Sequence, residues 1–496
     1  MNTVLLINPH YHRNWQYGVD AYSFPIGLLS LATVLSRAGF QPVIVDACVD
    51  ENFMDTIRRY LPDTLFAGLS VMTPQVPHAL EIAAEIRNAS PDTPLVWGGI
   101  HPTLYPESVT HPLCDAVAVG EGEDTAVDLA RAIWDGRDLE GVAGLVLADA
   151  GRGVVRTAAR PLCDMDALPW IDYRLIDAEK YIYTWSLQEL RMVRVIPVPA
   201  ARGCPWHCTF CINTTINAER RYRTRDTADL LDEIAHLVRE YNLEMVILSD
   251  EEFFADRGRV EAFLEGIEAR NLQHIRFNAT CRVNHFRRGY IDASFLKRLR
   301  QCGFVNLVFG FESGSPDCLE IIRKEITVEQ GLHAARLLAS ENFMAVWGFI
   351  MAIPGETRRD LVKTLRVMEK IRKLSRDNYF IGPQIFRPYP GSELYRRALE
   401  SGLDEPEDLA AWGRQEFTGE GWIGSGELLW IRPEDRALVE YVNYIAPVYY
   451  NRRYLGARSV KRVFHGVLRT LFRLRLSLGC WVFPVEHRIR RCFSGK

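Results

Sequence analysis

Three cysteines stand within ten residues, and they constrain the chain more than any other feature of its sequence. They are Cys204, Cys208 and Cys211, spaced C-x3-C-x2-C in the segment RGCPWHCTFC. Thiolates are soft ligands that select zinc, Cu(I) or iron–sulfur clusters. A structural zinc ion takes four protein ligands, and no second Cys or Cys/His pair follows at zinc-finger spacing. The loop therefore favours a cubane cluster with one open iron, and a zinc site that borrows His207 or a distant ligand is the alternative.

The spacing of this loop, with the aromatic Phe210 before its last cysteine, resembles the signature of the radical S-adenosylmethionine (SAM) enzymes. The resemblance implies that Cys204, Cys208 and Cys211 hold a [4Fe–4S] cluster and that SAM chelates its fourth iron. Electron transfer from the cluster then cleaves SAM into methionine and a 5′-deoxyadenosyl radical. Because such a spacing also recurs by chance, the rest of the chain has to carry the assignment.

Length and composition describe an ordinary globular chain. A length of 496 residues favours two to four domains, and 48% hydrophobic with 25% charged residues is typical of globular proteins. The eleven cysteines are mostly scattered and too few for a disulfide scaffold. A cluster loop also needs reduced thiols, so we expect a cytoplasmic protein. The start MNTVLLIN lacks the basic region of a signal peptide, and no apolar run reaches the roughly 18 residues of a membrane span.

Residues 1–140 alternate strand and helix patterns, as an open parallel sheet with helices requires. Two helices are expected, at 26–35 and at about 76–89. The expected strands are Val4–Asn8, Val43–Asp46, Leu65–Val71, Leu95–Trp97 and Ala116–Val119. Ligands bind doubly wound sheets beyond the carboxyl ends of such strands.

Small residues follow these strands, and small residues let backbone approach a flat ligand closely. They are Ser70, Thr73, Gly98, Gly99, Gly120 and Gly122. The pair of segments GGIHPT, with His101, and VGEGE, with Glu121, resembles the cobalamin-binding domain that precedes the barrel in cobalamin-dependent radical SAM enzymes. The resemblance implies that these eight residues contact cobalamin.

The loop after the first strand, residues 9–17, lacks the D-x-H-x-x-G motif whose histidine ligates cobalt in other cobalamin domains. His10 and His12 are present but out of that frame. The absence agrees with the radical SAM branch, where cobalt usually has no protein histidine. The alternative is a degenerate Rossmann-like domain without ligand.

Residues 141–190 are expected to be an irregular connector, rich in aromatic residues and packed between domains. Residues 191–403 then carry six strand patterns, each followed by a helical stretch. The expected strands are Val195–Ala201, Met245–Ser249, Arg276–Cys281, Val305–Phe311, Ala345–Met351 and Asn378–Phe386. Six such units match the partial (β/α)6 barrel of radical SAM enzymes, and chemistry in such barrels sits at the carboxyl ends of the strands.

By the same resemblance, each strand end has a role in binding SAM. One of Asp250 and Glu251 would hold the SAM ammonium group, which a carboxylate suits. Arg282 would pair with the SAM carboxylate through its planar fork, and Glu312 would contact polar groups or the ribose. The segment that includes Ile350 and Pro354 would line the adenine. A surface salt bridge is the alternative for any single carboxylate.

Residues 404–496 are expected to form a mainly helical C-terminal cap with a basic tail. The acidic, Trp-bearing stretch 405–430 would lie over the barrel mouth. From Tyr450 to Lys496 there are twelve Lys or Arg against Glu486 alone, which leaves −15 on the rest of a chain whose net charge is −4. Val460 to Arg475 interleaves apolar and basic residues, a pattern typical of an interfacial helix on anionic lipid. Packing of the helix on the acidic body is the alternative, and no motif indicates nucleic-acid binding.

The sequence predicts an α/β chain in which a Rossmann-like cobalamin domain precedes a radical SAM barrel. Its cofactors would be a [4Fe–4S] cluster, SAM and cobalamin. We expect an enzyme that methylates an unactivated carbon of a small molecule, with lipid-like molecules and tetrapyrroles as candidates, through the 5′-deoxyadenosyl radical and methylcobalamin. Oxidative ring formation, as in the anaerobic magnesium-protoporphyrin monomethyl ester cyclase family, and a non-catalytic cobalamin or redox sensor are the alternatives. Flavodoxin or ferredoxin would be the electron donor, and the tail would allow peripheral contact with the inner face of the membrane.

Overall fold

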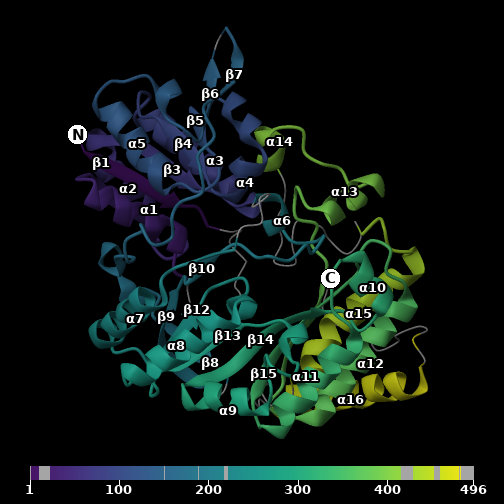
Figure 1. Ribbon diagram of the computed structural model, residues 1–496. Helices are drawn as coiled ribbons and strands as arrows, with labels where there is room; N and C mark the ends of the chain where they lie inside the picture. Colours follow the sequence, from purple (N-terminus) through teal and green to yellow (C-terminus); the bar gives the residue numbers. More distant parts are fainter. Residues whose placement is uncertain are drawn as a thin grey trace. The chain divides into compact units, whose positions relative to one another are not determined.

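The computed structural model of the chain divides into two compact units (Figure 1). The first joins Met1–Thr184 to Asp404–Gly424, and the second joins Trp185–Leu403 to Ser425–Lys496. The structure describes residues 2–10, 23–149, 151–187, 189–216, 222–414, 428–451, 459–479 and 481, and only the backbone of residues 185 and 459–465. The sequence placed all of 404–496 in a C-terminal cap, whereas residues 404–414 return to the first unit.

The first unit is built on a seven-stranded sheet of order β2-β1-β3-β4-β5-β6-β7. Its strands are β1 (Thr3–Asn8), β2 (Gln41–Asp46), β3 (Thr64–Ser70), β4 (Leu95–Gly98), β5 (Ala116–Ala118), β6 (Leu145–Asp149) and β7 (Gly153–Arg156). Its helices are α1 (Ile26–Arg37), α2 (Phe53–Tyr60), α3 (Val76–Ala89), α4 (Ile100–Leu104), α5 (Glu123–Trp134) and α14 (Leu409–Gly413). The strands β1 to β5 pair in parallel, which confirms the predicted doubly wound sheet.

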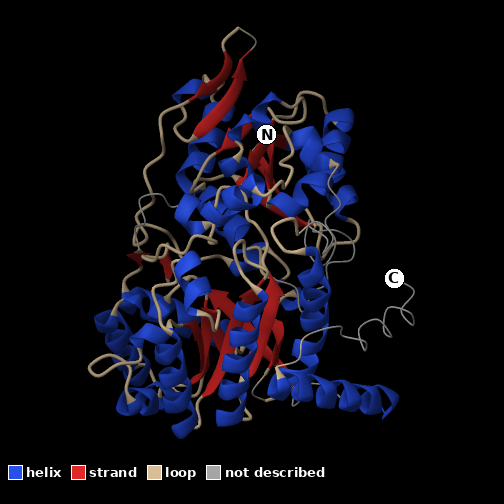
Figure 2. Cartoon of the chain, turned by 90° about the vertical axis from the view of Figure 1, so that its right-hand side faces the viewer, coloured by secondary structure: helices blue, strands red, loops and turns tan. Residues whose placement is uncertain are grey.

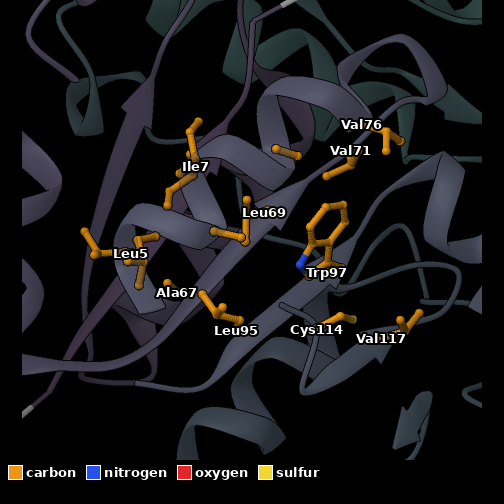
Figure 3. Close-up of a cluster of buried hydrophobic side chains, with 14 of the residues drawn as sticks. Leu5, Ile7, Ala67, Leu69, Val71, Val76, Leu95, Trp97, Cys114 and Val117 are labelled. Atoms are coloured by element: carbon orange, nitrogen blue, oxygen red, sulfur yellow. The ribbon is translucent and has the colours of Figure 1, made fainter. Parts of the chain in front are cut away.

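Alternation along the strands divides the core of this unit between the two faces of the sheet. Leu5 and Ile7 of β1 pack with α2 and α3 residues, whereas Val4 and Leu6 pack with α1 and α5 residues. Figure 3 shows the first of these two clusters, in which Trp97 is fully buried. Continuous apolar strands of this kind are expected when helices cover both faces of a sheet.

The predicted irregular connector is wrong for its first part, because residues 145–156 form a hairpin. The strands β6 and β7 pair antiparallel with each other, and β6 pairs antiparallel with β5, so the hairpin extends the first sheet. Gly153, with φ of +74°, stands after the turn, a backbone conformation that glycine adopts without steric cost. The short segment LVLAD followed by a glycine-containing turn carries the hairpin signal, which the aromatic residues further along obscured.

The second unit is built on a seven-stranded sheet of order β16-β15-β14-β13-β12-β9-β8. Its strands are β8 (Tyr183–Ser186), β9 (Arg191–Val198), β12 (Met245–Leu248), β13 (Arg276–Thr280), β14 (Phe304–Glu312), β15 (Met344–Met351) and β16 (Tyr379–Ile385), with a separate small pair of β10 (Ala201–Arg202) and β11 (Arg223–Thr224). From β9 to β16 each strand pairs in parallel with the next. All six predicted strands are present, and the predicted partial barrel is confirmed.

Helices follow the strands of the second sheet and pack along it, as Figure 2 shows for the blue helices beside the red strands. They are α7 (Thr227–Tyr241), α8 (Arg257–Ala269), α9 (Ala293–Gln301), α11 (Val328–Ser340) and α12 (Arg358–Leu374). The short helices α6 (Asn213–Ile216), α10 (Pro316–Ile321) and α13 (Glu393–Glu400) belong to the same unit. The sequence encodes them locally. In α7, Asp226 caps the N-terminus by accepting from the backbone N–H of Asp229 at 2.9 Å, and Leu230, Ile234 and Leu237 form its buried stripe.

Two further helices belong to the second unit, α15 (Pro433–Tyr450) and α16 (Ser459–Leu478). Just after α15, the Asn451 side chain accepts from the backbone N–H of Phe380 at 2.8 Å and donates to its carbonyl at 2.7 Å. The side chain thereby satisfies the open backbone of β16, the last strand of the sheet. Within the described residues, no helix has both the length and the apolar character to cross a membrane.

Candidate active site and cofactor-binding residues

The start of the cysteine loop is held by Asp250, which follows β12. One oxygen of its buried carboxylate accepts from the backbone N–H groups of Ala200 and Ala201, at 2.9 and 2.8 Å. The other oxygen accepts from Arg259 Nη1 at 3.1 Å. Burial raises the pKa of Asp250, and Arg259 and the two N–H groups oppose that rise. All of these contacts go to protein groups, so Asp250 supports the turn that leads into the loop.

The middle of the loop is held by Thr209, between two of the cysteines. Its backbone N–H donates to the carbonyl of Ile322 and its hydroxyl to that of Ile321, both at 3.0 Å. Its own carbonyl accepts from the backbone N–H of Leu394 at 3.0 Å. Three hydrogen bonds to two helical segments, α10 and α13, thus fix the backbone from which Cys208 and Cys211 project.

The three cysteines are free thiols; Cys208 is buried and the other two are half-buried. Burial raises the pKa of Cys204 to about 11 and also raises the pKa of Cys211, so binding of a metal cluster must displace protons from them. A structural zinc ion takes four protein ligands, whereas the loop supplies three thiolates. His207 lies beside Glu325, 3.8 Å away. The donor set fits a cluster, in which each thiolate binds a different iron.

Arg282, predicted to bind the SAM carboxylate, lies against the cysteine loop. Its Nη1 is 3.7 Å from Cys208 Sγ, and its Nη2 donates to the carbonyl of Lys324. The guanidinium carbon stands 4.0 Å from the ring centroid of Trp206, a cation–π distance. Arg282 therefore braces one cysteine, the loop tryptophan and the segment after α10 together.

Glu312, at the end of β14, forms a buried ion pair with Lys324 at 3.0 Å. Burial alone would lower the pKa of Lys324, but Glu312 and the nearby Cys208 raise it. A Cβ added to Gly310 would stand 2.3 Å from Glu312 Oε1 and 3.0 Å from Lys324 Nζ, so only glycine leaves room for the pair. Lys324 Nζ also lies 5.6 Å from the ring centroid of Phe210, which brings a positive charge to the cysteine loop.

Of the two candidate carboxylates for the SAM ammonium group, Glu251 is the one at the surface. Neighbouring protein groups partly desolvate its carboxyl and raise its pKa, and hydrogen bonds from its own backbone and from Asn213 oppose that rise. The next residue, Glu252, is buried and lies 3.4 Å from His285 Nε2. The structure therefore divides the predicted carboxylate cluster into Asp250 and Glu252, which face protein, and Glu251, which faces solvent.

Ile350 and Pro354 lie at the end of β15 and in the turn after it, and Pro354 is buried. The register shifts on both sides of this strand, between Gly310 and Glu312 towards β14 and between Gly348 and Ile350 towards β16. Such irregularities re-aim side chains at the ends of barrel strands. Because β9 to β16 are parallel neighbours, their carboxyl ends gather all of the predicted strand-end residues of this unit at one edge of the sheet.

Sequence reasoning missed Lys324, Trp206, Glu252 and His285 as parts of this edge. Trp206 and Glu252 stand inside segments that were singled out, so proximity to the cysteines could have suggested them. Lys324 stands three residues beyond α10, and nothing in its spacing indicates that it turns back to Glu312. Only the fold reveals it.

In the first unit, the predicted cobalamin residues also gather at the carboxyl ends of parallel strands. Ser70 ends β3, Gly98 ends β4, and Gly120 follows β5 with φ of +81°. A Cβ on Gly99 would stand 2.9 Å from the backbone nitrogen of Val71. The neighbouring loop of the protein therefore requires a residue without a Cβ at position 99. A Cβ at Gly120, in contrast, would meet nothing within 4 Å.

His101 is fully buried, so its side chain does not reach the surface of this edge. Its Nδ1 lies 3.2 Å from Thr73 Oγ1, and its ring centroid is 5.0 Å from Tyr105 and 5.3 Å from Trp412 of α14. Burial lowers the pKa of His101 to about 3, which keeps the imidazole neutral. Among the described residues, none offers its Nε2 a hydrogen bond. Burial of the His101 side chain therefore argues against the predicted direct contact between His101 and cobalamin.

Glu121 and Gly122 connect the same edge to the segment beyond the hairpin. Glu121 Oε2 accepts from the backbone N–H of Cys163 at 2.8 Å. Gly122 is the N-cap residue of α5, and a Cβ there would stand 3.1 Å from Leu31 of α1. Both residues have structural partners within the unit.

A polar network at the ends of β1 and β2 was not predicted. Asp46 accepts from Asn8 Nδ2 and from the Tyr181 hydroxyl, both at 2.9 Å, and Asn8 Oδ1 accepts from Gln75 Nε2 at 3.0 Å. Burial raises the pKa of Asp46, although these partners oppose the rise. The network lies beside the switch point between β1 and β3. His10 stacks on His78 nearby. His12 and the other residues of 11–17, where the D-x-H-x-x-G motif would stand, lie outside the described residues.

Comparison with known families gives the class of the chain. The model of the B12 binding domain matches residues 19–130, and the model of the radical SAM superfamily matches residues 198–368. The chain belongs to the cobalamin-dependent radical SAM enzymes, and its cofactors are a [4Fe–4S] cluster, SAM and cobalamin.

Three comparisons define the relatives. The chain is 29% identical over 406 residues to an uncharacterized methyltransferase of Pyrococcus horikoshii, covering 81% of this chain and 84% of the relative. It is 31% identical over 417 residues to the anaerobic magnesium-protoporphyrin IX monomethyl ester cyclase of Rubrivivax gelatinosus, covering 79% of this chain and 69% of the relative. The structure of the radical SAM methyltransferase TsrM from Kitasatospora setae, with cobalamin and [4Fe–4S] cluster bound, has a TM-score of 0.67 at 18% identity, over 96% of this chain and 100% of that one. The last of these shows a shared fold.

Proposed function

We propose that this protein methylates an unactivated carbon of a small-molecule substrate. The observation that carries the proposal is the presence of two cofactor modules in one chain: a braced loop of three free thiols and a sheet edge of the B12-binding family. When bound, the cluster and SAM supply a radical and cobalamin supplies a methyl carrier. A relative named as a methyltransferase, similar over 84% of its length, supports this reaction class.

The residues of the barrel have separate roles in the proposal. Cys204, Cys208 and Cys211 hold the cluster, and Arg282 positions Cys208 by the contact described above. Glu251 binds the SAM ammonium group, because it is the more exposed of the two residues, whereas both oxygens of the buried Asp250 accept from protein groups. Glu312, with Lys324, presents charge to the polar part of SAM, and Ile350 and Pro354 line the adenine.

In the first unit, we assign the cobalamin contacts to Ser70, Gly98, Gly120 and the backbone around Gly99 and Gly122. Thr73 and His101, which are both buried and contact each other, then support this edge from within the unit. The buried, neutral imidazole of His101 lies between Tyr105, in a tilted contact, and Trp412, in an edge-to-face contact, so it fixes the loop after β4 and leaves the cobalamin contact to its neighbours.

The products formed from SAM test the proposal without knowledge of the substrate. Methyl transfer from SAM leaves S-adenosylhomocysteine, whereas radical formation leaves 5′-deoxyadenosine and methionine. The protein, reconstituted anaerobically with iron, sulfide and cobalamin and supplied with reductant, should form both products from methyl-labelled SAM, with label retained on the cobalamin fraction. Formation of 5′-deoxyadenosine with no S-adenosylhomocysteine would exclude methylation.

The second candidate is oxidative ring formation without methyl transfer. The 31% identity to the cyclase of Rubrivivax gelatinosus, over 69% of that protein, favours it. Under this alternative, only 5′-deoxyadenosine accumulates, and a tetrapyrrole is the substrate class to try first. A small flavodoxin or ferredoxin would serve as electron donor in either case, and the free thiols imply a reducing compartment such as the cytoplasm.

A further inference from the structure

The helix α16 has two apolar faces, and within the described part of the chain only one of them packs against protein. Leu468, Phe472 and Leu476 are buried, and the Phe472 ring lies 4.8 Å from Tyr449 and 6.1 Å from Tyr441 of α15. Figure 1 shows α16 beside α12 and α15 at the edge of this unit. This first face anchors the helix to the barrel unit.

The second face is exposed. Val467, Leu471, Leu474 and Leu478 have relative exposures of 54%, 36%, 49% and 75%. Their spacing of four, three and four residues places them on one stripe of the helix. At 1.5 Å per residue, the stripe extends for about 17 Å. An isolated exposed leucine needs no explanation, but four in one line form a patch that is typical of an interaction surface.

Positive charge lies on a different side of α16, because Arg473 and Arg469 stand about 130° and 170° around the helix from the stripe. A cavity of about 1000 Å³ lies between α12, α15 and α16. The arginines that line it are Arg372, Arg376, Arg469 and Arg473. Arg372 is neutralised by Glu369 at 2.7 Å. The exposed Arg376 and Arg473 outnumber Asp377, the acidic residue of the lining, so the cavity keeps a net positive charge.

We propose that α16 docks this protein on an anionic lipid bilayer. The stripe of Val467, Leu471, Leu474 and Leu478 enters the interfacial region, and the long side chains of the exposed Arg376 and Arg473 extend to the headgroups. A helix with an apolar stripe and flanking arginines lies in the plane of such an interface. Each basic side chain near the surface adds to the attraction by anionic lipid.

Charge complementarity favours lipid over the other occupants of this face. The chain before residue 450 carries −15 and the remainder +11, so an anionic surface attracts this end and repels the rest. A second copy paired through the same stripe would cover the leucines but leave these arginines without an opposite charge. A nucleic acid would bring its phosphates against the apolar stripe.

Vesicle sedimentation tests the proposal with the full chain. The protein should sediment with vesicles of two parts phosphatidylcholine to one part phosphatidylglycerol, and remain in solution with phosphatidylcholine alone. Leu474→Glu should lower the partition coefficient at least about tenfold. Ser477→Glu is the matched control, because Ser477 is exposed on the same turn and receives the same charge; it should lower partitioning by about threefold or less. Circular dichroism and iron content check that both variants fold.

A separate part of the experiment tests the arginines. Replacing exposed Arg376 and Arg473 by Gln should lower partitioning onto the anionic vesicles about tenfold, and 0.5 M salt should do the same to the unaltered protein. Three results would overturn the proposal: no sedimentation with anionic vesicles, equal partitioning of Leu474→Glu and Ser477→Glu, or a dimer in sedimentation velocity that Leu474→Glu dissociates while vesicle binding is absent. None of these measurements uses turnover, so their outcome is independent of the proposed methylation.

Discussion

At Arg282, one guanidinium contacts three parts of the cysteine loop and its surroundings: a cysteine sulfur, an indole ring and a carbonyl oxygen. Lysine would keep the charge but could not stack on Trp206 and reach both other partners, because its ammonium is a point charge. Groups that orient metal ligands are typically worth about 10–100-fold in activity.

We therefore expect Arg282→Lys to lower reductive SAM cleavage about 10–100-fold and to alter the electron paramagnetic resonance spectrum of the reduced cluster. The exposed Arg287→Lys, in the same segment, is the control and should leave both unchanged. A normal spectrum and normal cleavage in Arg282→Lys would show that the contact with Cys208 has no effect on the cluster.

The ion pair of Lys324 and Glu312 makes a second prediction, about stability. Both side chains are about nine-tenths buried, and removing one partner of a buried pair leaves an uncompensated charge. Lys324→Met should therefore destabilise the second unit by about 3–5 kcal/mol, measured by urea unfolding. The double variant Lys324→Met/Glu312→Gln should recover most of the loss, and additive losses would contradict the pairing.

His101 makes a prediction about pH. Its pKa is about 3 in the folded chain and about 6.5 when unfolded, so the unfolded state binds a proton first as the pH falls. The stability that the neutral imidazole contributes is complete above pH 6.5 and declines below it by about 1.4 kcal/mol per pH unit. Between pH 7 and pH 5 the first unit should lose about 2 kcal/mol through this residue. His101→Gln should flatten that dependence, and the exposed His274→Gln should not.

At the scale of elements, the short helix α14 fills a slot on the first unit. Trp412 is 1% exposed, lies 5.5 Å from the Tyr105 ring, and is followed by Gly413, which packs against Leu80 of α3. Five residues of helix have little stability of their own, so the packing of the tryptophan holds the helix in place.

Trp412→Ala should cost the first unit about 3–5 kcal/mol and speed its cleavage by protease in the 404–414 segment. Trp430, which donates to the carbonyl of Ala352 at 2.7 Å in the other unit, offers the comparison: Trp430→Ala should leave proteolysis at 404–414 unchanged. Equal proteolysis of Trp412→Ala and the unaltered protein would show that α14 is held by other contacts.

Elements were predictable wherever a local pattern sufficed. The strands β12 to β16 and the helix α3 follow from apolar runs and their periods, and the cysteine loop follows from its spacing. The interaction partners of individual side chains were less predictable from the sequence. Asp250 and Glu251 are neighbours with the same chemistry, and only the position of the turn at Ala200 decides which of them faces protein. The position of α14 was not predictable, because five residues with one tryptophan do not indicate where they pack. The slot is formed by residues more than 300 positions earlier in the chain.

At the scale of the whole molecule, the two cofactor modules occupy separate units with separate cores. The B12-binding match ends at residue 130, before the cysteine loop begins. The triple variant Cys204→Ser/Cys208→Ser/Cys211→Ser should therefore lose all cluster iron and all SAM cleavage but still bind cobalamin, as its absorption spectrum after gel filtration would report. Cys48→Ala, a cysteine of the first unit, should keep the iron. Loss of cobalamin together with iron would mean that the modules depend on each other for binding.

The return of residues 404–414 to the first unit also sets an order of events during synthesis on the ribosome. The first 184 residues emerge early, but Trp412 emerges some 230 residues later, which takes about 10–50 s at the usual rates of elongation. Throughout that interval the slot formed by Leu80, His101 and Tyr105 is open to water, while the whole barrel is being made. The nascent N-terminal unit thus exposes an apolar surface to chaperones, and its folding is completed only after the strands of the barrel have left the exit tunnel.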